Sequence, residues 1–265
     1  MGILNATPDS FSGGRRFLNV PAATDAGLAM IAEGADWLDV GGESTRPGAP
    51  PVSEAEELDR VIPVIQALRA RGATPISVDT MKPAVARAAV AAGASLWNDV
   101  TALMFDASSL ETAAEIGCAV LLMHMRGVPA TMQIDPRYDD VVAEVVAFLA
   151  ARAAAAEAAG VAKERIWLDP GIGFGKTAAH NLALLATLSR LVNLGVPVLL
   201  GASRKGFIRA VDPTAQAPLD RLGGSLAAAI AGARAGVAMV RVHDVRETRQ
   251  ALAVASAIEE ARRCE

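Results

Sequence analysis

The chain has 265 residues, of which 52% are hydrophobic and 20% are charged. This composition excludes a disordered or fibrous protein, and the length allows one domain or two. The 25 basic and 29 acidic residues give a formal charge of -4. Without a basic surplus, the chain has no electrostatic reason to bind a nucleic acid.

The two cysteines, Cys118 and Cys264, are too far apart in the sequence to indicate a disulfide framework or a cysteine metal site. A reducing, cytoplasmic compartment is therefore expected. The longest mostly apolar run, 224–240, is rich in alanine and glycine and contains Arg234. It predicts a buried helix and strand rather than a membrane span. The first residues lack the pattern of a signal peptide.

Short apolar runs alternate with longer segments of helical periodicity along the whole chain, which is the pattern of a parallel sheet built from βα units. The predicted strands are Gly2–Leu4, Trp37–Val40, Ile76–Val78, Ser95–Trp97, Ala119–Met123, Ile166–Leu168, Val196–Leu200 and Ala238–Val242. Eight such units favour an α/β fold of the closed (β/α)8 TIM barrel type. An open, doubly wound sheet is the alternative that the spacing allows.

Three of the intervening segments carry clear helix signals. Ser53 and Glu56 form a potential capping box ahead of an apolar stripe. A second helix is predicted over 138–159 and a last one over 245–263. The last helix places four apolar residues on one side: Ala251, Val254, Ala255 and Ile258. Because no linker interrupts the chain, we expect one domain, 1–265.

Polar side chains follow nearly every predicted strand, where a barrel enzyme builds its site. They are Asn5, Asp39, Asp79, Asn98, Asp99, His124, Asp169, Ser203, Arg204, Lys205, Arg241 and His243. Any single aspartate here could instead cap a helix or belong to a turn. Capping does not require a lysine, an arginine or a histidine, so the set as a whole predicts a polar site.

Glycine-rich loops follow several strands and allow a close approach of a ligand to the backbone. The segment 171–177 resembles a P-loop, but Pro170 stands where the first glycine of that motif is required. An anion site is better placed at Ser203–Lys205 and Arg241–His243, after the seventh and eighth strands. Arg204 is equally well explained as a solvated surface charge.

Eight segments, in order, resemble the dihydropteroate synthase family of pterin-binding enzymes. They are Gly2–Ser12, Asp39–Gly48, Ile76–Thr80, Asn98–Asp99, Leu122–Met125, Leu168–Lys176, Ser203–Lys205 and Arg241–Asp244. The resemblance implies a (β/α)8 barrel that joins 6-hydroxymethyl-7,8-dihydropterin pyrophosphate to 4-aminobenzoate and releases pyrophosphate and 7,8-dihydropteroate. It also implies a cytoplasmic homodimer that is a target of sulfonamides, with small-molecule substrates, and neither a nucleic acid nor a membrane as a partner.

The resemblance also assigns roles to residues. The pterin-binding positions are Asp79, Asn98, Val100, Met123, Asp169, Gly201, Lys205 and Arg241. Pyrophosphate is expected at Asn5, Arg46, Arg241 and His243, and Mg²⁺ at Asn5. The aminobenzoate pocket is expected to include Thr45, Arg46, Pro47, Phe174 and Lys205. The catalytic residues are then Arg46, Lys205 and Arg241.

The sequence departs from the family pattern in two loops. Ser12 runs directly into Gly13, without the aspartate that helps the family to hold Mg²⁺, and Gly206 stands where many members have serine or arginine. The missing aspartate keeps a non-catalytic pterin-binding paralogue open as an alternative. A folate-dependent methyltransferase is a second alternative, but it would not need the Arg46 loop or His243.

Overall fold

The computed structural model describes residues 1–7, 19–44, 49–72 and 74–263. Its strands are β1 (Gly2–Asn5), β2 (Leu38–Gly41), β3 (Ile76–Asp79), β4 (Leu96–Asp99), β5 (Ala119–Met123), β6 (Ile166–Asp169), β7 (Leu199–Leu200) and β8 (Met239–Val240). All eight predicted strands are confirmed. Several continue onto the polar residue that was expected to follow them, and β7 and β8 are shorter than predicted.

The strands form one closed ring. Parallel pairing runs in chain order from β1 to β6, and β7 pairs with β8 in the same direction. Two parallel bridges connect these sheets on both sides, Leu168 with Val198 and Gly2 with Val242. The fold is therefore a (β/α)8 barrel, and the open-sheet alternative is excluded.

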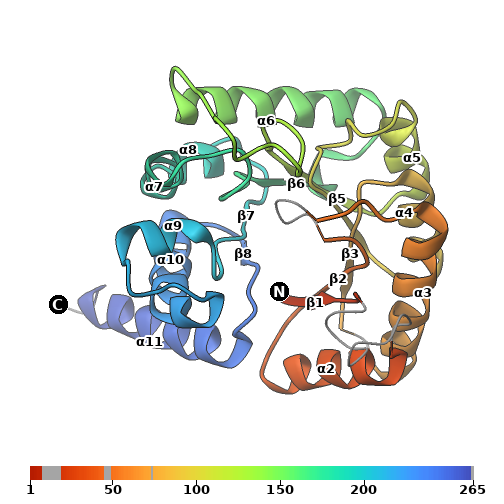
Figure 1. Ribbon diagram of the computed structural model, residues 1–265, viewed down its shortest axis with the longest axis horizontal. Helices are drawn as coiled ribbons and strands as arrows, with labels where there is room; N and C mark the ends of the chain where they lie inside the picture. Colours follow the sequence, from red (N-terminus) through yellow and green to blue (C-terminus); the bar gives the residue numbers. More distant parts are fainter. Residues whose placement is uncertain (8–18, 45–48, 73, 264–265) are drawn as a thin grey trace.

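The helices surround the strands on the outside (Figure 1). They are α2 (Val20–Ala32), α3 (Glu54–Arg71), α4 (Pro83–Ala91), α5 (Ser109–Ile116), α6 (Val141–Ala158), α7 (Ala178–Ala186), α8 (Ser189–Val192), α9 (Gly206–Val211), α10 (Leu222–Ala235) and α11 (Val245–Arg263), with short 3-10 turns η1 (Lys163–Arg165) and η2 (Pro218–Arg221). No helix in the described ranges is long and apolar enough to cross a membrane.

Helix boundaries follow local capping chemistry. Ser53 caps α3 by accepting a hydrogen bond of 3.3 Å from the Glu56 amide, but the Glu56 carboxylate pairs with Arg60, so only half of the predicted capping box forms. The predicted start of the α6 helix at residue 138 is three residues early, because Asp140 accepts hydrogen bonds from the amides of Val142 and Ala143. A side-chain acceptor at that position fixes the first turn of the helix.

Alternate residues of each strand face opposite sides of the barrel wall. Outward residues pack under the helices in the large core, including Leu38, Val40 and Trp97. Inward residues at the amino ends form a second, smaller core: Met1, Leu96, Leu121 and Leu199, with Trp37, Trp167 and Met239 against it. This apolar plug closes one end of the barrel, so the inward positions at the carboxyl ends are left for polar side chains.

Candidate active site

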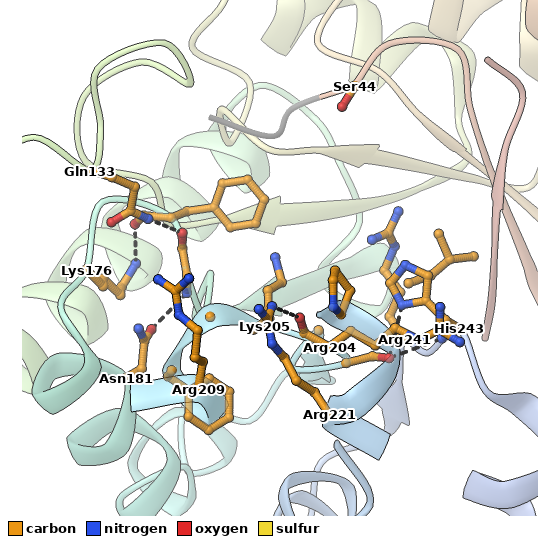
Figure 2. Close-up of a pocket in the computed structure, with 18 of the residues that line it drawn as sticks. Ser44, Gln133, Lys176, Asn181, Arg204, Lys205, Arg209, Arg221, Arg241 and His243 are labelled. Carbon is orange, nitrogen blue, oxygen red and sulfur yellow. Dashed lines mark hydrogen bonds between the residues drawn. The ribbon is translucent and has the colours of Figure 1, made fainter. Parts of the chain in front are cut away.

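A cavity of about 650 Å³ opens at the carboxyl ends of the strands (Figure 2). Its lining includes seven of the residues that the sequence predicts for the site: Asn5, Asp79, Phe174, Gly201, Lys205, Arg241 and His243. Four other predicted residues are at most 6% exposed and lie at or next to the strand ends: Asn98, Val100, Met123 and Asp169. Thr45, Arg46, Pro47 and the shortened loop after Ser12 lie outside the described residues.

Arg241 joins two carboxylates from neighbouring strands. Its Nε lies 2.5 Å from Oδ2 of Asp39, and its Nη2 lies 2.8 Å from Oδ2 of Asp79. Asn98 donates a hydrogen bond of 3.2 Å from Nδ2 to the same oxygen of Asp39. The other Asp39 oxygen, Oδ1, is buried and has no hydrogen-bond partner within the described chain. One guanidinium therefore serves two buried acids, and its planar shape suits both at once.

The charges in this cluster shift one another's ionisation. Burial raises the pKa of Asp79 to about 7, although Arg241 opposes that effect. Burial acts to lower the pKa of Arg241, but Asp39 and Asp79 outweigh it and hold the pKa above its ordinary value. Arg241 is thus a permanent cation, whereas Asp79 is able to exchange a proton near neutral pH.

Asp169 lies next to Gly201 on the adjacent strand. Its Oδ1 accepts a hydrogen bond of 2.7 Å from the Gly171 amide, and its Oδ2 would be 3.4 Å from a Cβ added at Gly201. Burial raises the pKa of Asp169, and the Gly171 amide and the charges of Lys205 and Arg241 oppose this rise. A side chain at residue 201 would lie against Oδ2, so the glycine leaves the space beside this oxygen open to a ligand.

Lys205 and Phe174 form one wall of the cavity. The Lys205 ammonium lies 4.1 Å from the centre of the Phe174 ring, which is the geometry of a cation–π contact. Both residues line the cavity, so Phe174 is more than an anchor for its own loop. This wall presents a flat apolar ring and a cation to whatever enters.

The loops after β7 and β8 are tied together at the anion corner that the sequence predicts. Ser203 Oγ lies 3.0 Å from Nδ1 of His243 and accepts a hydrogen bond of 3.2 Å from the His243 amide. Arg204 has a positive φ of 58°, and its guanidinium pairs with Asp244. The Arg204 side chain is therefore committed to holding the two loops together, although it also lines the cavity.

The role of Lys176 was not predicted. Its side chain is buried and its ammonium contacts three backbone oxygens, those of His124 at 3.2 Å, Gly171 at 2.9 Å and Phe174 at 3.0 Å. It also lies 2.9 Å from Nδ1 of His124. Burial lowers the pKa of Lys176 to about 7 and that of His124 to about 3. Lys176 ties its own loop to the end of β5, and the neutral ring of His124 is a satisfied strand-end histidine, as predicted.

Replacing Gly171 with alanine is expected to destabilise the protein strongly. Gly171 has φ +66°, and an added Cβ would lie 1.9 Å from the His124 carbonyl oxygen. Gly195 is a matched control, since it has φ +77° with no atom within 4 Å of the added Cβ. Backbone strain alone costs about 1–2 kcal/mol, so we expect that loss for Gly195→Ala and a larger loss for Gly171→Ala. Urea unfolding measures both, and equal losses would contradict the predicted clash.

A buried ionic cluster lies beside the cavity and was also missed. Lys82 Nζ lies 2.5 Å from Oε2 of Glu43 and 2.5 Å from Oε2 of Glu57. Glu57 is fully buried, and its Oε1 has no partner among the described residues. Glu43 lines the cavity, and its Oε1 accepts a hydrogen bond of 3.1 Å from the Val52 amide. Lys82 thus fixes the base of the loop that follows β2.

Replacing Lys82 with methionine is expected to cost about 3–5 kcal/mol of stability, because two buried carboxylates lose their cation. Burial already raises the pKa of Glu57. A carboxyl group with a raised folded-state pKa favours the folded state when protonated, so the loss grows as pH rises. Arg87→Met, on the α4 helix that begins after Lys82, removes an exposed pair with Glu115 and should cost at most about 1 kcal/mol. Chemical unfolding at pH 5 and pH 8 compares them, and equal losses would exclude a structural role for the cluster.

The fold and the site together define a class. A closed parallel barrel with carboxylates, a buried arginine and a lysine gathered around a cavity at its carboxyl end is the arrangement of a barrel enzyme for a small polar substrate.

Comparison with known proteins identifies the family. A family model described as pterin binding enzyme matches residues 1–243. The dihydropteroate synthase of Escherichia coli K12 is 49% identical over 257 residues, covering 97% of this chain and 90% of that protein. A structure of Xanthomonas albilineans dihydropteroate synthase with 4-aminobenzoic acid has a TM-score of 0.91 and 52% identity, covering 98% of this chain and 92% of that chain. The chain belongs to the pterin-binding enzyme family, among its dihydropteroate synthases.

Another structure of the Xanthomonas albilineans protein, in complex with 7,8-dihydropteroate, has a TM-score of 0.88 and 50% identity, with coverage of 98% and 92%. The Yersinia pestis enzyme, in a sulfonamide drug complex, has a TM-score of 0.92 and 46% identity, with coverage of 98% and 94%. The family resemblance seen in the sequence is therefore confirmed over nearly the whole chain.

Proposed function

We propose that this chain is a dihydropteroate synthase, a transferase that joins 6-hydroxymethyl-7,8-dihydropterin pyrophosphate to 4-aminobenzoate and releases 7,8-dihydropteroate and pyrophosphate. One observation carries the proposal. The inward positions at the strand ends bring Asp79, Asn98, Asp169 and Arg241 together, and Asp79 and Arg241 line the cavity. A relative of 50% identity has been solved with 7,8-dihydropteroate bound, which supports the same product here.

The pterin is placed among the buried carboxyl and amide groups. A pterin ring carries a guanidine-like edge, and a carboxylate such as Asp169 can accept two parallel hydrogen bonds from it. Asp79 and Asn98 lie at the ends of β3 and β4, and Lys205 lines the cavity. The proposed walls of the slot are Val100, Met123 and Gly201. Arg241 would stack on the ring and reach the pyrophosphate with the same guanidinium.

The reaction is a substitution at the pterin methylene carbon. The bond from that carbon to the pyrophosphate oxygen breaks, and its electron pair leaves with the oxygen. The amine of 4-aminobenzoate then forms the new carbon–nitrogen bond and gives up a proton to water. The amine is neutral at pH 7, so the chain's own residues act mainly by positioning and by stabilising the departing anion. Arg241 and His243 bind that anion in this proposal, together with Arg46 from the loop outside the described residues.

We place Mg²⁺ at Asn5. Mg²⁺ prefers oxygen ligands and keeps several waters, so one amide oxygen beside a pyrophosphate is an adequate protein contribution. The described residues contain no group of three or more His, Cys, Asp or Glu suited to a metal ion. When bound, the ion would neutralise charge on the leaving pyrophosphate. Asn5 would hold it at the cavity lining.

We place 4-aminobenzoate between Phe174 and Lys205, with Thr45, Arg46 and Pro47 completing the pocket from the loop after β2. The ring of Phe174 offers a flat surface for the aromatic ring of the acceptor. The ammonium of Lys205 over that ring supports an anionic acceptor on this side of the cavity. Closing loops would exclude water from the reactive pterin carbon.

A homodimer is supported by α11. The sequence places Ala251, Val254, Ala255 and Ile258 on one side of this helix. Val254 is 55% exposed and Ile258 is 46% exposed, and the buried residues of this helix are at its start. An exposed apolar stripe on the outermost helix is suited to a second copy of the chain. The cytoplasmic location and the single domain over 1–265 stay predictions.

The decisive test combines the purified protein with the pterin pyrophosphate, Mg²⁺ and 4-aminobenzoate and follows both products. We expect pyrophosphate and 7,8-dihydropteroate to appear in equal amounts. Tight pterin binding without turnover would contradict the synthase and support the non-catalytic paralogue. In that event, insertion of an aspartate between Ser12 and Gly13 tests whether the shortened loop is the cause.

A further inference from the structure

Arg209 lines the cavity and has no partner among the residues that the structure describes. It lies on α9, its side chain is exposed, and the described part of the chain offers it neither a hydrogen bond nor an ion pair. An arginine always carries its charge. A guanidinium that faces a substrate cavity without a protein partner is able to pair with an anionic group of the substrate.

The other cations of the described lining have contacts within the protein. They pair with carboxylates, backbone oxygens or an aromatic ring: Lys176, Arg204, Lys205, Arg221 and Arg241. Arg221, for example, donates to the backbone oxygens of Ala215, Arg204 and Gln216. Arg209 is therefore distinguished within the described lining by its lack of a contact, and not by its charge alone.

Gly206 leaves space on the same side of α9. Residues three apart on a helix lie on one face, which brings Gly206 and Arg209 together. A Cβ added at Gly206 would meet no atom within 4 Å, and both residues line the cavity. A larger residue at 206 would stand in this open space between Arg209 and Lys205.

The location of Arg209 separates it from the pyrophosphate corner. Figure 2 places Arg241 and His243 on one side of Lys205, and Arg209 on the other side, beside Asn181 and Gln133. The two amide side chains are already engaged with the backbone of Gly173. Asn181 Oδ1 accepts from its amide at 2.8 Å, and Gln133 Nε2 donates to its carbonyl oxygen. The guanidinium of Arg209, which has no such contact among the described residues, is available to a ligand at this end.

We propose that Arg209 binds the carboxylate of the arylamine acceptor and determines the preference for an anionic acceptor. The proposal rests on the proposed function. The amine of 4-aminobenzoate must face the pterin carbon near Arg241, so the carboxylate at the opposite ring position points to the other side of Lys205. There a guanidinium can bind it with two parallel hydrogen bonds. Gly206 leaves the path to it open.

The test compares two acceptors, 4-aminobenzoate and the uncharged 4-aminobenzamide, in the full-length enzyme. The measured quantity is the ratio of their kcat/KM values. Arg209→Ala is expected to lower the preference for the carboxylate about tenfold, and Arg209→Lys to retain part of it. Gly206→Leu should lower the same preference by filling the space. Arg190→Ala, on α8 and outside the cavity, should keep the wild-type ratio.

The outcomes separate the two proposals. An unchanged ratio in Arg209→Ala, with normal product formation, overturns the role of Arg209 and leaves the synthase in place. If the wild type forms no product, the proposed function fails, and calorimetric titration of 4-aminobenzoate into protein saturated with pterin pyrophosphate decides the role of Arg209. Weaker binding by Arg209→Ala than by Arg190→Ala then supports it, and equal or absent binding in both overturns it.

Discussion

Replacing Arg241 with alanine is expected to abolish turnover and to destabilise the fold at the same time. Arg241 lies between the carboxylates of Asp39 and Asp79, at 2.5 Å and 2.8 Å. Loss of one partner from a buried charged cluster costs about 3–5 kcal/mol, because the remaining charges stay buried without compensation. In the proposed reaction Arg241 is a positioned cation that binds the leaving group, and its loss should lower kcat/KM by a factor of about 1000. The two ion pairs are the reason that we expect a loss of stability as well as a loss of activity.

A second variant separates the two effects. Arg241→Ala with Asp39→Asn removes one buried negative charge together with the cation, so it should recover much of the lost stability but none of the activity. The remaining loss of stability depends on pH. The folded-state pKa of Asp79, about 7, lies above its ordinary value of 3.8. Asp79 therefore costs stability increasingly as pH rises from about 4 through 7.

Urea unfolding at pH 5.5 and pH 8, and product formation, are measured for the single and double variants. We expect Arg241→Ala to lose more stability at the higher pH. If the single and double variants unfold at the same urea concentration, the charge cluster does not set stability. If either variant keeps wild-type kcat/KM, Arg241 is not part of the reaction.

The strand-end positions were the part of the site that sequence could predict. Inward and outward residues alternate along each strand. A polar residue at the end of an apolar run is therefore assigned to the barrel mouth when it occupies one of the inward positions. Asn98 and Asp99 show the limit of a coarser reading. Both follow the same predicted strand, but Asn98 faces Asp39 inside the barrel, whereas Asp99 accepts hydrogen bonds from Thr101 and Leu103 on the helix side.

Partners that are distant along the chain were not predictable. Lys82 is an ordinary residue before a helix in the sequence, and only the folded chain brings Glu43 and Glu57 to it. Lys176 looked like part of a failed phosphate loop, but its ammonium binds the loop's own carbonyl oxygens. Such contacts depend on side-chain direction and on loop paths, and neither has a periodic signal in the sequence.

Replacing Asp169 with asparagine is expected to remove pterin binding and leave the fold nearly intact. The Asn oxygen can still accept the hydrogen bond that Asp169 Oδ1 receives from the Gly171 amide at 2.7 Å. Its NH₂ group then stands beside Gly201, where Oδ2 accepts one of the two parallel hydrogen bonds in the proposed pterin site. The substitution loses two charge-assisted hydrogen bonds, and its NH₂ group faces hydrogen-bond donors of the pterin. Pterin affinity should therefore fall by a factor of about 1000.

Asp99→Asn is the matched control, since Asp99 is also a buried aspartate at a strand end. Its Oδ1 accepts hydrogen bonds of 2.7 Å from the amide and the hydroxyl of Thr101, and its Oδ2 accepts one of 2.9 Å from the Leu103 amide. An asparagine leaves one of these donors facing an NH₂ group, which costs about 1–3 kcal/mol. Asp99→Asn should therefore lose stability and keep pterin affinity, the reverse of Asp169→Asn.

Calorimetric titration with the pterin pyrophosphate measures the affinity of both variants, and urea unfolding measures their stability. We expect Asp169→Asn to lose affinity and keep stability, and Asp99→Asn to lose stability and keep affinity. A loss of affinity in Asp99→Asn as large as that in Asp169→Asn would mean that stability, and not a direct contact, controls binding. Unchanged affinity in Asp169→Asn would remove that carboxylate from the pterin site. The crossed result follows only if alternation along β4 and β6 decides which buried aspartate faces the substrate and which one holds a loop.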